Sequence, residues 1–222
     1  MDTSDWSSAA ELLASGINTL KLDIDHQQQL LMIDFLKLLE KWNKAFNLTS
    51  ITQPQEMVVK HLLDSLVVIP RIHGPTVLDV GTGAGIPGIP LAIAKPEISF
   101  TLLDTNGKKT RFIKQACAQL GINNVAVEQS RIESFNPDAS FAQIICRAYS
   151  AISKFVDQTR QLIHPNAELL AMKGLLPESE IADLKNDGEL SRLVTIDQQI
   201  ELKVPYLDEQ RHLVILKSSN IE

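Results

Sequence analysis

Cysteine is scarce in this sequence: Cys117 and Cys146 are its only two, and they lie apart in a chain of 222 residues. Two isolated cysteines provide neither a disulfide framework nor a four-cysteine zinc site. Long apolar runs are also missing, since a stretch such as 66–69 is far shorter than the roughly 20 residues that cross a bilayer. We therefore expect a protein without disulfides and without a membrane span.

Two further absences bear on location and metal binding. Residues 1–16 are acidic and rich in serine, and they carry neither the positive start nor the apolar core of a secretory signal. The histidines show no spacing typical of metal ligands; they are His26, His61, His73, His164 and His212. We expect a cytoplasmic monomer that binds no metal and no membrane.

The net charge of −6 argues against attraction of nucleic acid over the whole surface. The charge is unevenly distributed, however. Residues 105–175 carry nine Lys and Arg against five Asp and Glu, whereas residues 176–222 carry five against ten. The acidic excess thus lies in the last part of the chain, and the locally basic middle remains compatible with a polyanionic partner.

The first third of the sequence is predicted to be helical. Asp25 and Gln28 have the spacing of a capping box, and apolar residues then recur at intervals of three and four, the period of one buried helix face. This face comprises Leu31, Phe35, Leu38 and Trp42. A second long helix is predicted to start near Pro54. Because the helical pattern ends at Gly74, we assign residues 1–74 to an N-terminal helical cap.

Residues 75–222 are predicted to form one α/β domain. Short apolar runs alternate there with helical stretches, the pattern of a mostly parallel sheet covered on both faces. The strands are predicted at 76–80, 100–104, 125–128, 143–146, 168–172, 193–204 and 212–217. The link between the last two is too short for a helical crossover, so they should form an antiparallel hairpin. A seven-stranded, mostly parallel, Rossmann-like sheet that closes with such a hairpin is the arrangement of class I methyltransferases that use S-adenosylmethionine.

A glycine-rich bend follows the first predicted strand. It runs from Gly81 through Gly83 and Gly85 to Gly88, and glycines there allow positive φ and the close approach of a ligand. Read from Gly83, the bend fits the dinucleotide pattern G-x-G-x-x-G, which would indicate NAD. Read from Gly81, it fits the G-x-G-x-G of methyltransferases. Asp79 favours the second interpretation, because a carboxylate in an apolar strand costs desolvation and an NAD site gives no reason for it; S-adenosylmethionine is therefore the expected cofactor.

Acidic residues follow the next two strands. Asp104 ends the second strand, where a carboxylate can hydrogen-bond the ribose hydroxyls of either nucleotide cofactor. Ser130-Arg131-Ile132-Glu133 follows the third strand and can place backbone and carboxylate beside an adenine. Ser130 and Glu133 also have the spacing of a capping box, and the two interpretations are compatible.

Basic side chains gather where a phosphate-rich partner could bind. Lys108, Lys109 and Arg111 lie in the first turn of a predicted helix, where the helix dipole disfavours cations by roughly 0.3–1 kcal/mol each. A polyphosphate lying across this helix start would supply the missing counter-charge, and a solvated surface is equally compatible. Arg147 and Lys173 follow the fourth and fifth strands, at the edge of the sheet where α/β folds hold ligands.

Motifs for two other kinds of methyl transfer are missing. No Asn-Pro-Pro-Tyr or Asp-Pro-Pro-Tyr segment follows the fourth strand, so recognition of an exocyclic amino group is not indicated. Cys146 ends that strand, but no second cysteine motif supports covalent attack on a pyrimidine. We expect Cys146 to be a small core residue.

Several segments, specific and in a fixed order, carry a family resemblance. They are Lys41–Ser50, His61–Ser65, Asp79–Pro90, Leu103-Asp104, Gly107-Lys108-Lys109, Ser130-Arg131, Arg147-Ala148, Lys173-Gly174 and Glu209–His212. With them the chain resembles, over nearly its whole length, the bacterial glucose-inhibited division protein B family, which methylates N7 of a guanine in small-subunit (16S) ribosomal RNA. The resemblance implies contacts with S-adenosylmethionine from Gly81, Ile86, Ile132, Glu133 and Arg147. It implies that Arg131, Lys173 and Arg211 face the RNA or the target base.

A chemical expectation follows from this resemblance. Guanine N7 carries a lone pair and no proton, so in-line methyl transfer needs no general base, and we name no catalytic residue. The expected partner is small-subunit ribosomal RNA or the small ribosomal subunit, with the target base unstacked. Two alternatives remain: a nicotinamide-dependent oxidoreductase, and a non-catalytic ribosome-binding factor that keeps S-adenosylmethionine as a structural ligand.

Overall fold

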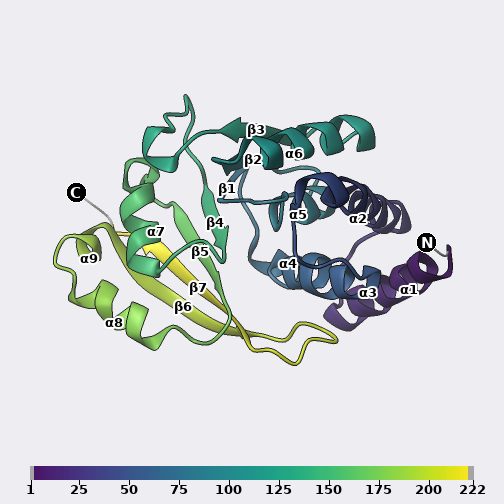
Figure 1. The fold of residues 1–222 in the computed structure, drawn as a ribbon. Helices are drawn as coiled ribbons and strands as arrows, with labels where there is room; N and C mark the ends of the chain where they lie inside the picture. Colours follow the sequence, from purple (N-terminus) through teal and green to yellow (C-terminus); the bar gives the residue numbers. More distant parts are fainter. Residues whose placement is uncertain (1–2, 220–222) are drawn as a thin grey trace.

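The protein is built on one mixed β-sheet with helices on both faces (Figure 1). A computed structural model describes residues 3–219. Within these residues the sheet has seven strands in the order β3-β2-β1-β4-β5-β7-β6. The strands are β1 (Thr76–Val80), β2 (Ser99–Asp104), β3 (Val125–Gln129), β4 (Gln143–Arg147), β5 (Glu168–Lys173), β6 (Val194–Leu202) and β7 (Arg211–Ser218).

The strand directions confirm the predicted architecture. β1 to β5 pair in parallel, and β7 runs antiparallel to both β5 and β6. Each predicted strand is present, and its ends lie within two residues of the predicted ones. Because β7 is antiparallel, its first residues lie at the same edge of the sheet as the carboxyl ends of the parallel strands, and His212 pairs with Lys173 there.

The helices divide between the two faces of the sheet. One face carries α1 (Thr3–Leu20), α2 (His26–Phe46), α3 (Pro54–Met57), α4 (Asp64–Leu66), α5 (Gly88–Ala94) and α6 (Gly107–Leu120), and the other carries α7 (Ile152–Thr159), α8 (Glu178–Asn186) and α9 (Leu190–Leu193). A hydrophobic core lies on each face of the sheet, and successive strand residues point to alternate cores. Val77 packs in the core under α1 to α6, and Leu78 packs in the core under α7 to α9. No helix within residues 3–219 has the length and apolar character needed to cross a bilayer.

The first helix was not predicted as a separate element. Ala9, Leu13 and Ile17, each four residues after the last, form a buried stripe on α1. The capping box that starts α2 is confirmed, because the Asp25 side chain accepts the Gln28 N–H at 2.8 Å and the Asp25 N–H donates to Gln28 Oε1 at 2.9 Å.

Aromatic contacts join α2 to α6, a helix that covers the sheet. The rings of Phe35 and Trp42 lie 6.0 Å and 5.7 Å from the ring of Phe112 in α6, measured between centroids. Such tilted pairs add to the apolar area that the helices bury. Helices α1 to α4 therefore share a core with α5 and α6.

The second predicted helix is present but irregular. It starts as α3 at Pro54, widens into a π-helical turn over Val58–Leu63, and continues as α4. The Asp64 N–H donates to Val59 O, five residues earlier, instead of to Lys60 O, four residues earlier. The Lys60 carbonyl thus lacks the bond that a regular α-helix would give it. Apolar spacing alone does not reveal such a widening.

Candidate active site

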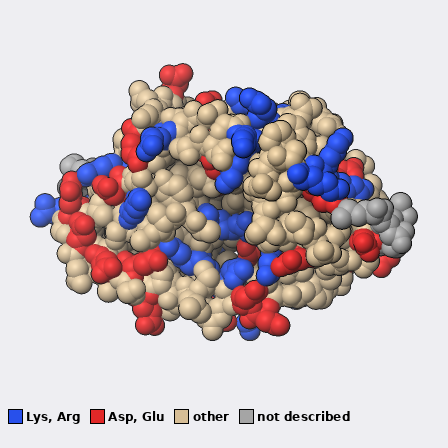
Figure 2. All heavy atoms as spheres, viewed as in Figure 1, with Lys and Arg blue, Asp and Glu red and all other residues tan. Residues whose placement is uncertain are grey.

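The carboxyl ends of β1, β4 and β5 and the start of β7 surround a cavity of about 510 Å³, which we call the basic cavity. Figure 2 shows a hollow in the middle of this face, with Lys and Arg side chains in and around it. The cations that line the cavity are Lys60, Lys109, Arg147, Lys173 and Arg211. They come from five separate elements, so only the folded chain brings them together.

A smaller cavity of about 220 Å³, which we call the narrow cavity, adjoins the basic cavity. It is lined by Val80, Gly81, Leu103, Asp104, Thr105, Ser130, Ile132, Ala148 and Tyr149. Gly81 and Ala148 line both cavities, so the two meet at this point. The predicted cofactor residues other than Glu133 line one or both of these adjoining cavities.

The glycine-rich turn has a backbone that only glycine adopts without strain. φ is +70° at Gly81, +63° at Gly83 and +85° at Gly85. A Cβ at Gly81 would lie 2.5 Å from Tyr149 Cδ2. At Gly83 the nearest atom to a Cβ would be Lys109 Nζ at 3.8 Å, so the backbone there is open to the basic cavity.

Asp79 is fully buried in β1 and holds this turn in shape. Its Oδ2 accepts hydrogen bonds from Thr82 Oγ1 at 2.6 Å and from the Gly88 N–H at 2.9 Å. Burial raises the pKa of the carboxyl to about 6, although both hydrogen bonds oppose the shift. The acidic residue in the apolar strand therefore links the end of β1 to the first turn of α5.

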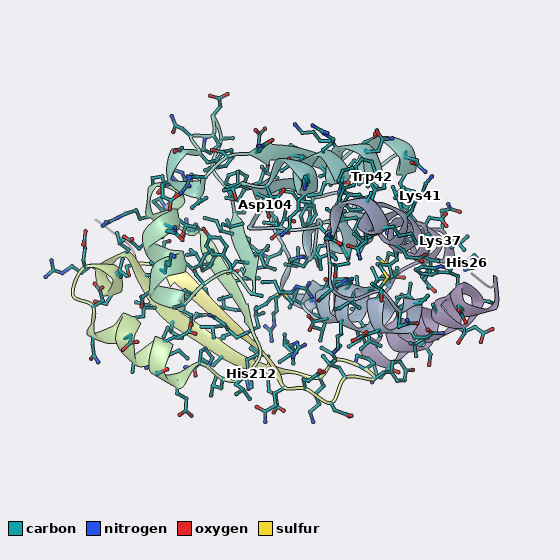
Figure 3. All side chains as sticks on the ribbon, viewed as in Figure 1. His26, Lys37, Lys41, Trp42, Asp104 and His212 are labelled. Carbon is teal, nitrogen blue, oxygen red and sulfur yellow. The ribbon has the colours of Figure 1, made fainter. Side chains whose placement is uncertain are left out.

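Asp104 also binds the turn, from the end of β2 (Figure 3). Its Oδ2 accepts the Gly83 N–H at 2.9 Å, and its Oδ1 accepts the Asn106 N–H at 2.8 Å. The carboxylate lines the narrow cavity and is only partly buried. Each carboxylate oxygen retains a second lone pair, so Asp104 can accept further hydrogen bonds from a ligand.

The segment after β3 differs from one of its predictions. Ser130 and Ile132 line the narrow cavity, but the predicted capping box between Ser130 and Glu133 is wrong. Only a single 3-10 turn, Ile132–Ser134, follows; Ser130 lies one residue before its N-cap, and the Ser130 hydroxyl donates to Arg131 O instead. Glu133 and Arg131 are exposed, and the Glu133 carboxylate accepts a hydrogen bond from Gln158 outside both cavities.

The three cations at the start of α6 separate in space. Asn106 caps the helix by accepting the Lys108 N–H at 3.0 Å. Lys109 lines the basic cavity, whereas Lys108 and Arg111 are exposed and lie outside it. The three cations therefore lie in the first turns of a helix, as predicted. Lys109 lines the basic cavity, and Lys108 and Arg111 lie at the surface.

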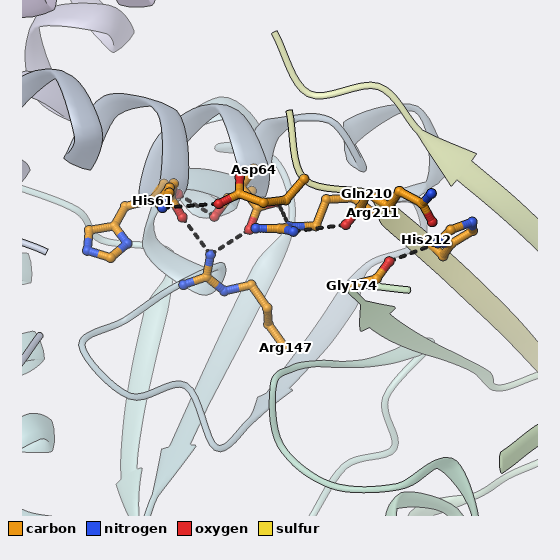
Figure 4. Close-up of polar contacts among 10 residues, drawn as sticks. His61, Asp64, Arg147, Gly174, Gln210, Arg211 and His212 are labelled. Carbon is orange, nitrogen blue, oxygen red and sulfur yellow. Dashed lines mark hydrogen bonds and ion pairs between the residues drawn. The ribbon is translucent and has the colours of Figure 1, made fainter. Parts of the chain in front are cut away.

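Asp64 joins Arg147 and Arg211 in the wall of the basic cavity (Figure 4). Arg147 Nη1 donates to Asp64 Oδ2 at 2.8 Å and to Lys60 O at 2.8 Å. Arg211 Nε donates to Asp64 Oδ1 at 2.8 Å. The Asp64 side chain is 5% exposed and each arginine 22%, so these charge-assisted bonds are largely shielded from water.

Lys173, at the end of β5, is held by two acceptors that do not line the basic cavity. Its ammonium donates to Glu180 Oε2 and to Ser150 O, both at 2.7 Å. The next residue, Gly174, is tied to β7, since Gly174 O lies 2.8 Å from His212 Nδ1 (Figure 4). Lys173 therefore lines the cavity with its charge already paired.

His61 is a buried residue of the cavity wall that the spacing of histidines did not single out. It is 4% exposed, and its Nε2 lies 3.1 Å from Thr49 Oγ1. Burial, followed by the charge of Arg147, lowers the pKa of His61 to about 4. The ring is accordingly neutral near pH 7.

Among the cavity residues that were not assigned a site role from the sequence are Thr49, His61, Asp64 and Tyr149. The first three lie in the segments that carry the family resemblance, which was the one signal that pointed to them. In the helical pattern His61 is simply part of an apolar stripe.

Two further predictions concern the chemistry of the site: Cys146 was expected to be a small core residue, and no metal site was expected. Cys146 is 2% exposed in the core, as predicted, and burial raises the pKa of its thiol. Among residues 3–219 no group of three or more His, Cys, Asp or Glu side chains could hold a metal ion.

Comparison with solved structures places the fold. A methyltransferase from Aquifex aeolicus described as S-adenosylmethionine-dependent has a TM-score of 0.54 and 20% sequence identity, over 71% of this chain and 90% of the other. The mitomycin 7-O-methyltransferase MmcR has a TM-score of 0.61 and 15% identity, over 96% of this chain and 68% of the other. At such identities the likeness concerns the fold, which is that of class I methyltransferases.

Comparison of sequences is more specific. A protein named ribosomal RNA small subunit methyltransferase G from Laribacter hongkongensis is 45% identical over 206 residues, 93% of this chain and 97% of the other. A protein of the same name from Yersinia pseudotuberculosis is 42% identical over 208 residues, 93% of this chain and 98% of the other. The model of the GidB family, rRNA small subunit methyltransferase G, matches residues 27–214. The chain therefore belongs to the rRNA small subunit methyltransferase G family.

Proposed function

We propose that this protein transfers a methyl group from S-adenosylmethionine to N7 of a guanine in small-subunit (16S) ribosomal RNA. Family membership supports the reaction class. The observation that carries the proposal is the junction at Gly81, where a narrow, partly apolar cavity meets a wide, basic one. A cofactor nucleoside fits the first and an RNA nucleotide the second.

The residues around the narrow cavity fit S-adenosylmethionine. Asp104 offers carboxylate oxygens to ribose hydroxyls, and Leu103 and Ile132 offer apolar surface to an adenine ring. Gly81 lines both cavities, and a Cβ there would clash with the Tyr149 ring, so glycine leaves space at this point for a ligand that spans both. The open backbone at Gly83 would let the methionine part of S-adenosylmethionine come close to the turn.

We assign cofactor contacts to six residues that line the two cavities and to Glu133, the neighbour of Ile132. They are Gly81, Gly83, Ile86, Asp104, Ile132, Glu133 and Arg147. Bound there, S-adenosylmethionine would supply an electrophilic methyl group carried on a sulfonium. Glu133 is directed away from the narrow cavity in this structure, so its contact would come from the backbone of the Ile132-Glu133 pair or after rotation of its side chain.

We assign RNA contacts to six cations: Lys108, Lys109, Arg111, Arg131, Lys173 and Arg211. Lys109, Lys173 and Arg211 line the basic cavity and would hold the target nucleotide. Lys108, Arg111 and Arg131 are exposed and would meet phosphates farther along the strand. The net charge of −6 is compatible with RNA, because Lys and Arg side chains gather in and around the hollow on this face (Figure 2).

The chain's part in the reaction is to orient the base. Guanine N7 has a free lone pair, so no side chain has to remove a proton before transfer, and no residue is assigned as acid or base. His61 is neutral near pH 7 and bonded to Thr49, which suits a wall residue more than a proton carrier. The rate enhancement would then come from holding N7 in line with the methyl group.

Two parts of the chain would share this work. Residues 75–222 supply the glycine-rich turn and all of the assigned cations, and the helical cap, residues 1–74, supplies Thr49, His61 and Asp64 to the wall of the basic cavity. We further propose that the protein acts as a cytoplasmic monomer, with naked RNA or the small ribosomal subunit as substrate.

The deciding experiment is transfer of a labelled methyl group. Wild-type protein, Gly81→Arg and Arg147→Ala are incubated with labelled S-adenosylmethionine and with either naked 16S RNA or small subunits, and the RNA nucleosides are separated by mass spectrometry. We expect 7-methylguanosine with the wild type and little with either variant. Calorimetry with S-adenosylmethionine and NAD tests the oxidoreductase alternative. Cofactor binding without transfer to either substrate would favour the ribosome-binding factor.

A further inference from the structure

Asp64 is the only described residue that binds two of the cations in the basic cavity at once. Arg147 ends β4 and Arg211 starts β7, and β5 lies between these strands in the sheet. The two strands are thus about 10 Å apart at their axes. Two guanidinium groups repel one another, so a shared carboxylate is what brings them together at this edge.

The π-helical turn adds a second anchor for Arg147. In a regular α-helix the Asp64 N–H would donate to Lys60 O, but here it donates to Val59 O. Lys60 O instead accepts Arg147 Nη1 at 2.8 Å, the same nitrogen that donates to Asp64 Oδ2. The widened turn therefore presents one carbonyl and one carboxylate to a single guanidinium, a use typical of π-turns at functional sites.

Both arginines keep donors for a ligand. Among the hydrogen bonds of residues 3–219, those of Arg147 use only Nη1, and those of Arg211 use Nε and, to Gln210 O, Nη1. The remaining N–H groups have no protein partner there, and both side chains line the basic cavity. One carboxylate against two guanidiniums also leaves a net positive charge, which suits a phosphate or a carboxylate ligand.

From this geometry we infer that Asp64 is a positioning residue for methyl transfer. It fixes the guanidinium planes of Arg147 and Arg211 so that their free N–H groups face the cofactor and the RNA. The inference rests on the proposed function for the identity of those two ligands. The geometry is independent of the proposed function, since the bonds to Asp64 can be detected without any substrate.

The test uses Asp64→Asn, which keeps the shape of the side chain, removes its charge and leaves one oxygen to serve two arginines. We expect the dissociation constant of S-adenosylmethionine and the KM for small subunits both to rise, each by about fivefold or more, because each arginine loses a charge-assisted bond. Arg211→Gln should raise KM for RNA in the wild-type background and add little in the Asp64→Asn background.

Asp197→Asn is the matched control. Asp197 Oδ2 pairs with Lys217 Nζ at 3.2 Å on the β6–β7 hairpin, outside the basic cavity, and the same change there should leave both constants unchanged. Nitrogen-15 spectra of the arginine side chains give a readout that needs no activity. The Arg211 Nε–H signal should be protected from solvent exchange in the wild type and exposed in Asp64→Asn.

The outcomes separate the two proposals. If the wild type transfers no methyl group to RNA, the proposed function fails, and the arginine spectra decide the role of Asp64 alone. If Asp64→Asn lowers thermal stability but keeps both constants and the Arg211 signal of the wild type, Asp64 is merely structural and the inference is overturned. Additive effects of Asp64→Asn and Arg211→Gln would overturn it as well.

Discussion

The ring of Tyr149 lies against Gly81, at the point where the basic and narrow cavities meet. Tyr149 Cδ2 is 2.5 Å from the position that a Cβ of residue 81 would occupy. Tyr149 follows Ala148, whose φ of +51° is unusual for a residue with a side chain. A ligand that spans both cavities has to share this junction with the tyrosine ring.

Gly81→Ala should therefore weaken cofactor binding and the fold together. The added Cβ meets the ring, and a φ of +70° costs an L-residue about 1–2 kcal/mol of the free energy of unfolding. We expect the affinity for S-adenosylmethionine, measured by calorimetry, to fall by about tenfold or more, equivalent to about 1.4 kcal/mol. Adding Tyr149→Ala should recover the part of the stability lost to the contact with the ring.

Gly188→Ala serves as the comparison for Gly81→Ala. No atom would lie within 4 Å of a Cβ at Gly188, and its φ is not positive, so this variant should match the wild type. Equal cofactor affinity in Gly81→Ala and Gly188→Ala would contradict the role given to the junction.

Asp79 should make the protein less stable as the pH rises. Its pKa is about 6 in the folded protein, above the ordinary 3.8, so the folded state binds the proton more tightly than the unfolded state. The resulting stabilisation is complete below pH 3.8 and is lost as the pH rises through 6. Compared with the wild type, Asp79→Asn should gain roughly 2 kcal/mol in free energy of unfolding between pH 4 and pH 7.5. Urea denaturation at several pH values measures the difference, and a constant difference would refute the assignment.

His61 should make the protein less stable as the pH falls. Its pKa is about 4 in the folded protein, below the ordinary 6.5, so the neutral ring stabilises the fold above pH 6.5 and this stabilisation is lost as the pH falls towards 4. The free energy of unfolding of His61→Asn, relative to the wild type, should thus rise by roughly 3 kcal/mol from pH 7.5 to pH 4. The same urea experiments, with an NMR titration of the ring, provide the measurement. A ring that titrates near pH 6.5 would contradict this result.

Lys108 and Arg111 should contribute to RNA affinity through phosphates alone. Both are exposed and lie outside the basic cavity, so replacing either with alanine should leave the affinity for S-adenosylmethionine unchanged. Each replacement should reduce the slope of log K against log salt by about 0.7–0.9. Filter binding of 16S RNA fragments over a range of salt concentrations measures the slope. Lys185→Ala, in α8 on the other face of the sheet, is the control. If it changes the slope equally, the effect of Lys108 and Arg111 comes from the overall charge of the protein and not from their position.

The fold could be predicted because its signals are local. Strand lengths, the capping box at Asp25 and Gln28, and the short link before β7 each follow from neighbouring residues. α1 lies within the predicted helical cap but was not delimited as an element, although Ala9, Leu13 and Ile17 follow one another at four-residue spacing. The capping box at Ser130 failed because no α-helix follows to use it.

The site could be predicted only in part. Asp79, the glycines and Asp104 lie within one strand-turn-helix unit and its neighbouring strand, so their proximity follows from the sequence pattern. Asp64 is different, because its partners are 83 and 147 residues away in the chain. The sequence pattern also does not show that the helix widens just before Asp64 and releases Lys60 O.

The bonds of Asp64 also limit how the protein can open. Asp64 belongs to the helical layer and both of its arginine partners belong to the sheet, so the three side chains fasten one layer to the other. A hinge motion that lifted the helices would break both bonds together and leave a carboxylate without counter-ions in a shielded place. RNA that entered the basic cavity would therefore meet a wall in which the helices and the sheet stay joined through Asp64.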